Sequence, residues 1–372
     1  MIKSKEMAKK TKGDISLLVA VALLSIIGTI FVYSASNYSA SATYNDSFYF
    51  VKKQIIGVLL GIVAMIAVGF FDFEKLKKIA PYICIISVIL LVLVFVPSIG
   101  VESYGAKRWL NLGFFTIQPS ELAKFSLILF SATYLSSNSN KGKRFIGCLP
   151  VVLFGCIICV LVMLEPNMSI TVCIALLMLT ILFASGIKLK KFMFLIIPAL
   201  VLAVVLIIIE PYRLKRLMAF LNPWSNPKGE GYQLLQSLYA LGSGGWFGVG
   251  LFNSRQKFAF LPFAESDFIL SVIGEEIGFV GLIFLFLLMF FIIIRGLIIA
   301  SKAKNLFGFL LAVGITMIFG IQTIINALVV TGSIPPTGLS LPLVSSGNTS
   351  IVIFMTEIGI LYNISKNKSL TF

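Results

Sequence analysis

The sequence predicts an all-α membrane protein, a polytopic bundle of transmembrane helices. Two observations predict this fold. First, 58% of the 372 residues are hydrophobic and only 12% are charged, whereas a soluble protein carries roughly 25% charged residues. Second, the apolar residues gather in runs of about 20, the length that an α-helix needs to cross a bilayer. Together these observations exclude a globular domain with a single membrane anchor.

About ten such runs follow one another along the chain. They cover residues 15–35, 51–71, 79–96, 119–135, 145–164, 168–186, 192–209, 267–294, 306–331 and 341–364. The lysine-rich residues 1–12 precede the first run, which has no small-residue cleavage site, so we expect a retained span and not a signal peptide. We expect residues 13–209 to hold spans one to seven, and residues 266–372 to hold spans eight to ten with a short cytoplasmic tail.

Basic residues mark one side of the membrane. They gather in the N-terminal tail 1–12, in the connections after the second, fourth, sixth and eighth spans, and in the C-terminal tail. Short loops rich in lysine and arginine stay in the cytoplasm, so we expect both termini there. The net charge of +15 suits contact with anionic lipid headgroups. We therefore expect this basic chain to contact membrane lipids and not nucleic acid.

The connection 210–265 is the one sizeable polar insertion, and we expect it on the extracytoplasmic side. Its basic residues break the charge rule, as do Lys107 and Arg108 before the fourth span. Long loops cross the membrane regardless of charge, which explains part of this pattern. Cations on the outer face, beside tryptophans at headgroup depth, would also suit an anionic lipid-linked ligand.

The chain contains no histidine. Its absence excludes nucleophile activation by histidine and any zinc site that uses it. Cys156 and Cys159 form a C-x-x-C within an apolar run, where we expect small packing residues and not a redox pair. A carboxylate is the natural general base that remains.

Asp267 is the main candidate for chemistry. It lies at the start of the eighth predicted span, at the outer edge of the membrane, where it faces the basic connection. The alternative is a helix N-cap or first-turn acid that stabilises the helix dipole. Desolvation would raise the pKa of Asp267 and neighbouring cations would lower it, and the sequence leaves this balance open.

Other charged residues lie within apolar spans, where charge is costly. Glu121 and Lys124 share one face of the fourth span, where they can neutralise each other and hold two helices together, and this role is compatible with contact to a ligand. Glu275 and Glu276 lie about two turns deeper than Asp267, and their flanking glycines favour helix packing with one glutamate paired. The glycine-rich stretch 242–250 fits no nucleotide-binding spacing, so we expect a conformational role.

Several longer motifs occur in order along the chain. They are Gly105-Ala106-Lys107-Arg108-Trp109-Leu110, Gln118-Pro119-Ser120-Glu121-Leu122-Ala123-Lys124, Gly231-Tyr232-Gln233-Leu234-Leu235-Gln236-Ser237, Gly242-Ser243-Gly244-Gly245, Asn253-Ser254-Arg255-Gln256-Lys257, Ser266-Asp267-Phe268-Ile269 and Pro335-Pro336-Thr337-Gly338. This set spans essentially the whole chain and resembles that of the SEDS family (shape, elongation, division and sporulation), which contains FtsW, RodA and SpoVE. The motif 253–257 and the segment after the first span are more similar to the FtsW/SpoVE branch than to RodA.

The resemblance implies a peptidoglycan glycosyltransferase of the bacterial cytoplasmic membrane. Such an enzyme polymerises lipid II, an undecaprenyl-pyrophosphate-linked disaccharide peptide, on the outer face, for the division septum or the spore cortex. The implied partner is a class B penicillin-binding protein, a transpeptidase. The family's essential aspartate falls on Asp267. The motifs supply candidate substrate contacts at Lys107, Arg108, Gln118, Glu121, Lys124, Gln236, Ser243, Arg255 and Lys257.

The chemistry of this reaction agrees with the residues present. Glycan extension needs a base for the acceptor hydroxyl and cations for the leaving diphosphate. The diphosphate is already a good leaving group, so no second carboxylic acid has to protonate it, unlike in a glycosidase. The candidates for the diphosphate are Arg108, Lys124, Arg255 and Lys257. No cofactor is predicted; a divalent cation, Mg²⁺ or Mn²⁺, is left open because no ligand cluster indicates one.

Two other functions compete with polymerisation. The chain could be a flippase, a transporter that moves lipid II across the membrane, or a non-catalytic scaffold that recruits the transpeptidase. A flippase should carry polar groups through the bilayer midplane, whereas the polar residues here gather toward the outer face. This distribution favours the enzyme.

Overall fold

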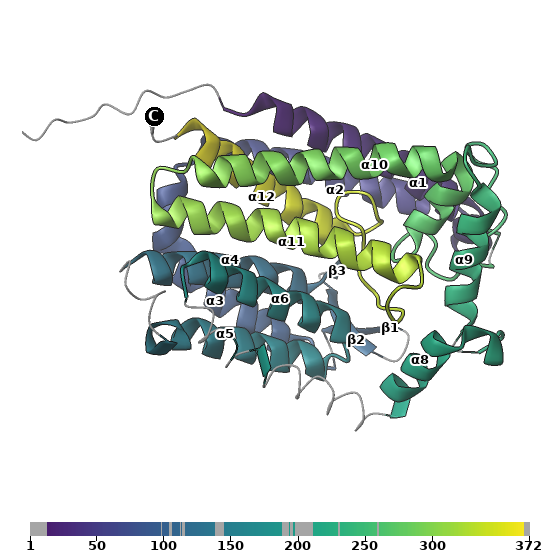
Figure 1. The fold of residues 1–372 in the computed structure, drawn as a ribbon, viewed down its shortest axis with the longest axis horizontal. Helices are drawn as coiled ribbons and strands as arrows, with labels where there is room; N and C mark the ends of the chain where they lie inside the picture. Colours follow the sequence, from purple (N-terminus) through teal and green to yellow (C-terminus); the bar gives the residue numbers. More distant parts are fainter. Residues whose placement is uncertain are drawn as a thin grey trace, which may run out of the picture.

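The computed structural model describes residues 13–97, 99–103, 106–111, 113, 116–137, 145–187, 193, 196–197, 211–229, 231–258 and 260–367. The predicted tail 1–12, most of the predicted span 192–209 and the basic connections 138–144 and 188–191 lie outside these residues. Within them the chain is almost entirely helical and forms a bundle of long helices that run in nearly the same direction (Figure 1). The predicted all-α bundle is therefore confirmed.

The bundle helices follow the predicted apolar runs. They are α1 (Ile15–Tyr44), α2 (Tyr49–Phe70), α3 (Leu76–Leu93), α4 (Pro119–Ser136), α5 (Phe145–Leu164), α6 (Met168–Ala184), α10 (Ile269–Ser301), α11 (Leu306–Val330) and α12 (Asn348–Lys366), with a 3₁₀ turn, η1 (Phe73–Lys75), before α3. Among the described residues, 6 helices are both long and apolar enough to cross a membrane. Helices α4, α6 and α12 are shorter or more polar, so the count of about ten spans stays a prediction.

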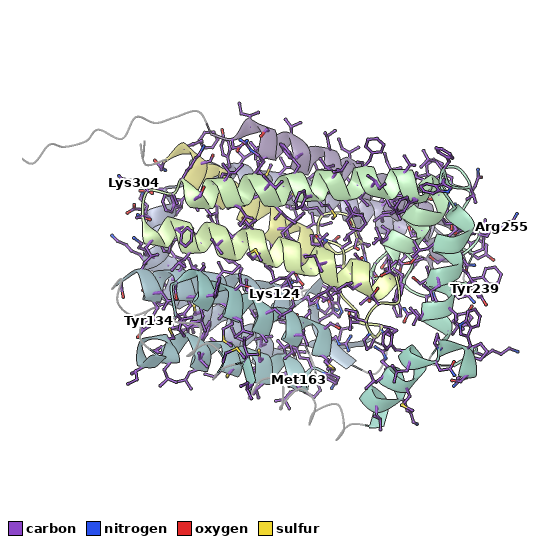
Figure 2. All side chains as sticks on the ribbon, viewed as in Figure 1. Lys124, Tyr134, Met163, Tyr239, Arg255 and Lys304 are labelled. Atoms are coloured by element: carbon purple, nitrogen blue, oxygen red, sulfur yellow. The ribbon has the colours of Figure 1, made fainter. Side chains whose placement is uncertain are left out.

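The long polar connection forms a small helical layer over one end of the bundle. It contains α8 (Pro211–Leu221), the 3₁₀ turn η2 (Pro223–Ser225) and α9 (Tyr232–Gly244), all on the right in Figure 1. Figure 2 shows Arg255 at this end and Lys304 at the opposite end. These positions agree with the predicted orientation, in which the two residues face opposite sides of the membrane.

The first and last bundle helices meet at the end opposite this layer (Figure 1). The backbone N–H of Asp14 donates to the Ser365 hydroxyl at 2.9 Å, and the Asp14 carboxylate pairs with Arg295 of α10. The two ends of the described chain thus share one side, as predicted for two cytoplasmic termini.

A small antiparallel sheet precedes α4 and was not predicted. Its strands are β1 (Gly100–Ser103), β2 (Ala106–Asn111) and β3 (Thr116–Ile117), in the order β1-β2-β3. Leu110, which is 1% exposed, anchors β2 in the core. Gly100 permits the close approach of β1 to the end of α3, because a Cβ there would lie 2.1 Å from the Val94 carbonyl oxygen. The sheet matters because β2 carries Lys107 and Arg108.

Glycines bring α2 close to α12. A Cβ at Gly61 would lie 2.4 Å from the Met355 sulfur, and a Cβ at Gly359 would lie 2.5 Å from the Met65 carbonyl oxygen. Small residues favour such close contacts in membranes, where van der Waals packing drives helix association. Glycines of α10 serve in the same way, because a Cβ at Gly296 would clash with the Thr316 side chain of α11 and a Cβ at Gly274 would lie 2.6 Å from Leu241 of α9.

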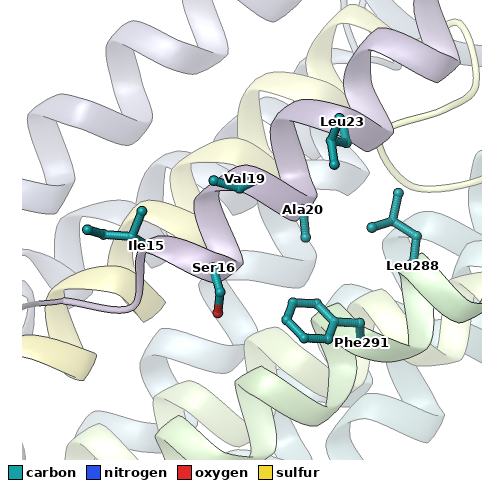
Figure 3. Close-up of a pocket in the computed structure, with 7 residues that line it drawn as sticks. All are labelled: Ile15, Ser16, Val19, Ala20, Leu23, Leu288 and Phe291. Atoms are coloured by element: carbon teal, nitrogen blue, oxygen red, sulfur yellow. The ribbon is translucent and has the colours of Figure 1, made fainter.

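Two apolar cavities lie on the sides of the bundle. One of about 410 Å³ lies between α1 and α10 and is lined by Ile15, Ser16, Val19, Ala20, Leu23, Leu288 and Phe291 (Figure 3). The other, of about 560 Å³, lies between α1, α2 and α12. Their linings suit hydrocarbon and not a diphosphate, and neither includes a residue predicted for the site.

Candidate active site

Asp267 lies in the turn just before α10, outside the membrane-spanning helix. The N-cap of α10 is Phe268, and it makes no side-chain capping bond, so the helix-cap alternative does not describe Asp267. The Asp267 carbonyl oxygen instead accepts a hydrogen bond from the Asn326 side chain of α11 at 2.8 Å. The same Asn326 nitrogen donates to the Leu339 carbonyl oxygen at 2.7 Å. Helix α11 therefore fixes both the Asp267 turn and the segment before α12.

This segment forms one wall around the carboxyl group. The Ser345 hydroxyl donates to the Ser266 carbonyl oxygen at 2.6 Å, which holds the segment against the turn. A Cβ at Gly338 would lie 3.0 Å from Asp267 Oδ2. The missing side chain at this glycine thus leaves room for the carboxyl group.

Two arginines from distant parts of the chain lie near Asp267. Arg108 comes from β2 and Arg216 from α8, and the charge of each acts on the Asp267 carboxyl. Arg216 also donates from Nη1 to the Pro336 carbonyl oxygen at 3.5 Å. The structure therefore brings together a carboxyl and two guanidinium groups at the outer end of the bundle.

The protein environment changes the acidity of Asp267. Burial raises the pKa of the carboxyl to about 6, against the charges of Arg108 and Arg216 and with the added repulsion of Glu265. Many protein atoms surround the group, yet the side chain keeps partial access to solvent. Desolvation thus outweighs the cations, which answers the question that the sequence left open. Such a carboxylate is a stronger base than a surface aspartate and is still ionised at pH 7.

Arg108 is docked on the link between α5 and α6. Its Nε donates to the Glu165 carbonyl oxygen at 3.2 Å, and its Nη2 donates to the Pro166 carbonyl oxygen at 2.5 Å. These bonds fix the guanidinium group beside the Asp267 turn. Lys107, the preceding residue of β2, is half-buried in the same strand.

The predicted contacts Glu121 and Lys124 form an ion pair inside the bundle. Lys124 Nζ lies 2.8 Å from Glu121 Oε1 and donates to Gln322 Oε1 of α11 at 2.6 Å. Figure 2 shows Lys124 in the middle of the molecule. Gln322 precedes Asn326 by one turn of α11, so the pair lies about 6 Å deeper than the Asp267 turn. The pair holds α4 against α11, as the structural alternative predicted.

Lys257 is buried on the other side of α10, with 3% of its surface exposed. Its Nζ donates to the Phe252 carbonyl oxygen at 2.6 Å and lies 3.5 Å from Glu276 Oε1. Its neighbours in the motif are held by Glu275, which accepts from the Arg255 backbone N–H at 3.0 Å. These contacts indicate that Lys257 holds the connection on α10, and they argue against contact with a diphosphate.

The glycine-rich stretch shapes the backbone, as expected. Gly278 interrupts α10 with a φ of +68°, and the freed Phe279 N–H donates to the Gly245 carbonyl oxygen at 2.9 Å. On the same side, the Val249 N–H donates to the Glu275 carbonyl oxygen at 2.9 Å. The expected helix packing is wrong for Gly278, which faces residues 246–248 of the connection, but Gly274 does pack against Leu241 of α9. One glutamate is paired as expected, because Glu276 lies 3.5 Å from Lys257 Nζ.

The remaining predicted contacts are spread over the outer end. Gln118 is the N-cap of α4, and its N–H donates to the Thr349 hydroxyl at 3.3 Å. On α9, Gln236 is half-buried and Ser243 is exposed. Arg255 is exposed near the tip of the molecule (Figure 2). The structure does not bring these four residues into contact with Asp267.

Sequence reasoning missed three residues of this region. Arg216 is one of several basic residues in its connection, and nothing in the sequence distinguishes it. Glu165 lies in a tight link and gives no motif. Asn326 did leave a signal, because an amide inside an apolar span usually hydrogen-bonds another segment. In the described part of the chain, no group of three or more metal-ligating side chains is placed to hold an ion.

The fold and these side chains define a class: a multi-pass helical membrane protein with a titratable carboxyl and two arginines at one end. The chain matches the model of the FtsW/RodA/SpoVE family, described as a cell cycle protein, over residues 15–370. It therefore belongs to this family, which is the SEDS family that its motifs predicted.

Two relatives fit the predicted branch. The chain is 38% identical over 362 residues to "Stage V sporulation protein E" of Bacillus subtilis (strain 168), covering 96% of this chain and 98% of the relative. It is 40% identical over 353 residues to a "Probable peptidoglycan glycosyltransferase FtsW" of Trichlorobacter lovleyi, covering 95% and 93%. The predicted resemblance to the FtsW/SpoVE branch is thus confirmed.

Solved structures share the fold. One is a chain from "Structural coordination of polymerization and crosslinking by a peptidoglycan synthase complex", with a TM-score of 0.78, 26% identity, and coverage of 96% of this chain and 99% of that one. Another is the rod shape determining protein RodA of Thermus thermophilus, with a TM-score of 0.71, 24% identity, and coverage of 96% and 98%. The predicted multi-pass membrane architecture is confirmed.

Proposed function

We propose that this chain is a peptidoglycan glycosyltransferase that polymerises lipid II at the outer face of the bacterial cytoplasmic membrane, for the division septum or the spore cortex. The observation that carries the proposal is Asp267, a carboxyl whose pKa burial raises to about 6 and which lies within range of Arg108 and Arg216. The names of its relatives, a peptidoglycan glycosyltransferase and a sporulation protein, support the same conclusion.

In the proposed reaction, Asp267 acts as the general base. It takes the proton of the acceptor sugar hydroxyl while the hydroxyl oxygen bonds to the anomeric carbon of the donor. The bond between that carbon and the diphosphate oxygen breaks, and the diphosphate leaves with the electron pair. Arg108 and Arg216 stabilise the negative charge on the leaving diphosphate, because guanidinium groups bind phosphate oxygens in paired hydrogen bonds.

The other predicted contacts divide into two groups. We propose that Lys107, Gln118, Gln236, Ser243 and Arg255, on the outer end of the molecule, contact the rest of the substrate. Glu121, Lys124 and Lys257 are buried and paired, so we propose that they support the site from within the bundle. A divalent cation has no described ligand cluster, and no step of the proposed reaction uses one.

We also propose a class B penicillin-binding protein as the partner. One solved structure with this fold belongs to a peptidoglycan synthase complex in which polymerization and crosslinking are coordinated. Crosslinking is the chemistry of a transpeptidase, so a polymerase and a transpeptidase would act on the same glycan strand. Membrane lipids surround the bundle in this proposal.

Polymerisation of labelled lipid II tests the proposed function. The purified protein, alone and with its transpeptidase, is reconstituted in vesicles, and the glycan products are separated by gel electrophoresis. Asp267→Asn should lower the rate by about 100-fold or more, since general base catalysis contributes roughly 10²–10⁴-fold. Asp46→Asn is the matched control, because Asp46 pairs with Lys52 at 2.7 Å on the surface, where an ion pair contributes little.

The outcomes separate the competing functions. Polymer from the wild type and from Asp46→Asn, but not from Asp267→Asn, supports the enzyme. Movement of labelled lipid II between leaflets without elongation would indicate a flippase. If the wild type made no polymer even with the transpeptidase present, and moved no lipid, the result would contradict the enzyme and favour the scaffold function.

A further inference from the structure

Glu165 is a buried carboxyl that the proposed reaction does not use. It lies in the link between α5 and α6, outside both helices, and its side chain is 1% exposed. Neither of its carboxylate oxygens has a hydrogen-bond partner among the described residues. The next polar residue of the link, Asn167, caps α6 through the Ile170 N–H at 3.4 Å. Helix capping therefore does not explain why position 165 carries a carboxyl group.

The main chain of this link is also the docking point of Arg108. The guanidinium group donates to the carbonyl oxygens of Glu165 and Pro166, at 3.2 and 2.5 Å. It consequently lies within one side chain's reach of the Glu165 carboxyl, and its charge acts on that carboxyl. The same charge acts on Asp267. The charge of Arg108 thus acts on two carboxyl groups, Asp267 in the site and Glu165 in the link between α5 and α6.

The surroundings of Glu165 favour its neutral form. A buried carboxylate without donors is costly, and burial raises the pKa of Glu165 to about 8 despite the opposing charge of Arg108. From the neighbouring elements, β2 presents Arg108 and α4 carries Glu121 and Lys124, which pair with each other at 2.8 Å. Arg108 also acts on Asp267, whose other charged neighbours are Glu265 and Arg216.

We propose that Glu165 is a positioning residue that controls how much of the Arg108 charge is available to the diphosphate. In its neutral form it leaves the guanidinium group to Asp267 and the substrate. When it is ionised, it forms an ion pair with Arg108 inside the protein and withdraws that charge from the site. The inference rests on the proposed function, because it assigns to Arg108 the task of holding the leaving diphosphate.

A pH profile of polymerisation tests this role. The rate should rise with Asp267 ionisation and fall with Glu165 ionisation, which gives a bell-shaped curve. Glu165→Gln keeps the size of the side chain and cannot ionise, so the alkaline decline should disappear. Relative to wild type, this variant should be about equally active at pH 7 and up to about tenfold more active at pH 9. The wild-type KM for lipid II should rise over the same range, and the KM of Glu165→Gln should not.

Two further variants provide the controls. Glu74→Gln changes an exposed carboxyl at the opposite end, which accepts from Asn305 at 2.9 Å, and should keep the wild-type alkaline decline. Glu165→Leu is also unable to ionise, so it replaces Glu165→Gln if the glutamine variant does not fold. Size-exclusion profiles and melting curves in detergent report folding for each variant.

Each outcome decides the inference. Loss of the alkaline decline in Glu165→Gln or Glu165→Leu, with a constant KM, supports it. An unchanged decline in a folded variant overturns it, as does a folded variant that is inactive at every pH. These outcomes apply when the wild type makes polymer and Asp267→Asn does not. A wild type that makes no polymer contradicts the proposed function instead.

Discussion

Two charge sites of this protein lie about one helical turn apart and are built in opposite ways. Deep in the bundle, Lys124 has a carboxylate at 2.8 Å and an amide oxygen at 2.6 Å, so its charge is neutralised and hydrogen-bonded. At the outer end, Asp267 receives the fields of Arg108 and Arg216, but burial still raises its pKa to about 6. The first arrangement stabilises a fixed charge, and the second leaves a group that titrates near neutral pH.

The difference explains why only one of the two sites suits proton transfer. An acid or base is effective when its pKa lies near the working pH, as the pKa of about 6 for Asp267 does. A paired charge in the membrane interior instead joins helices, because separating the partners would leave each one unsolvated. We therefore assign the chemistry to Asp267 and the support of α4 and α11 to the pair.

The largest expected effect on stability comes from breaking the pair. Lys124→Met leaves Glu121 buried without a counter-charge and should destabilise the protein by about 3–5 kcal/mol. Asp267→Asn removes no ion pair and should change stability by less than about 1 kcal/mol. Melting curves in detergent measure both. The double variant Glu121→Leu/Lys124→Met should recover most of the loss, and a Lys124→Met protein as stable as wild type would show that the pair has no structural role.

A smaller effect is expected from crowding the titrating site. Gly338→Ala places a methyl group 3.0 Å from Asp267 Oδ2, so the carboxyl must shift. A misplaced catalytic group loses rate steeply, and we expect about a tenfold lower turnover with little change in melting temperature. Gly347→Ala is the control, since its methyl group would make only an ordinary 3.6 Å contact with Ser350. Equal turnover in both variants would place the reacting atoms away from this face of Asp267.

The helical bundle and its most polar end were predicted correctly from the sequence. The length of an apolar run reflects the thickness of the membrane, and the charge of a short loop reflects the side on which it lies. The sequence was less informative about which cations lie near Asp267. Lys257 and Arg216 both look like basic residues of one connection, yet Lys257 pairs with Glu276 inside the protein and Arg216 lies near the carboxyl. The break in α10 at Gly278, where the connection docks, was likewise not predicted by any local pattern.

Other parts of the site depend on contacts between distant segments. Arg108 was predicted from its motif, but its docking on Glu165 and Pro166 needs the sheet, whose strands are too short for a clear alternating pattern. Asn326 joins Asp267 to Leu339, three positions that the sequence gives no reason to connect. The pKa of Asp267 depends on burial by all of these segments together.

The pH dependence of polymerisation on the acid side tests the central claim most directly, because it reports the ionisation of Asp267 itself. With purified wild-type protein and labelled lipid II, kcat/KM should increase about tenfold per pH unit below about 6 and level off toward about pH 7, before the alkaline decline, as the pKa of about 6 for Asp267 requires. A rate that stays constant between about pH 5 and 7 would contradict the assignment of Asp267 as the general base.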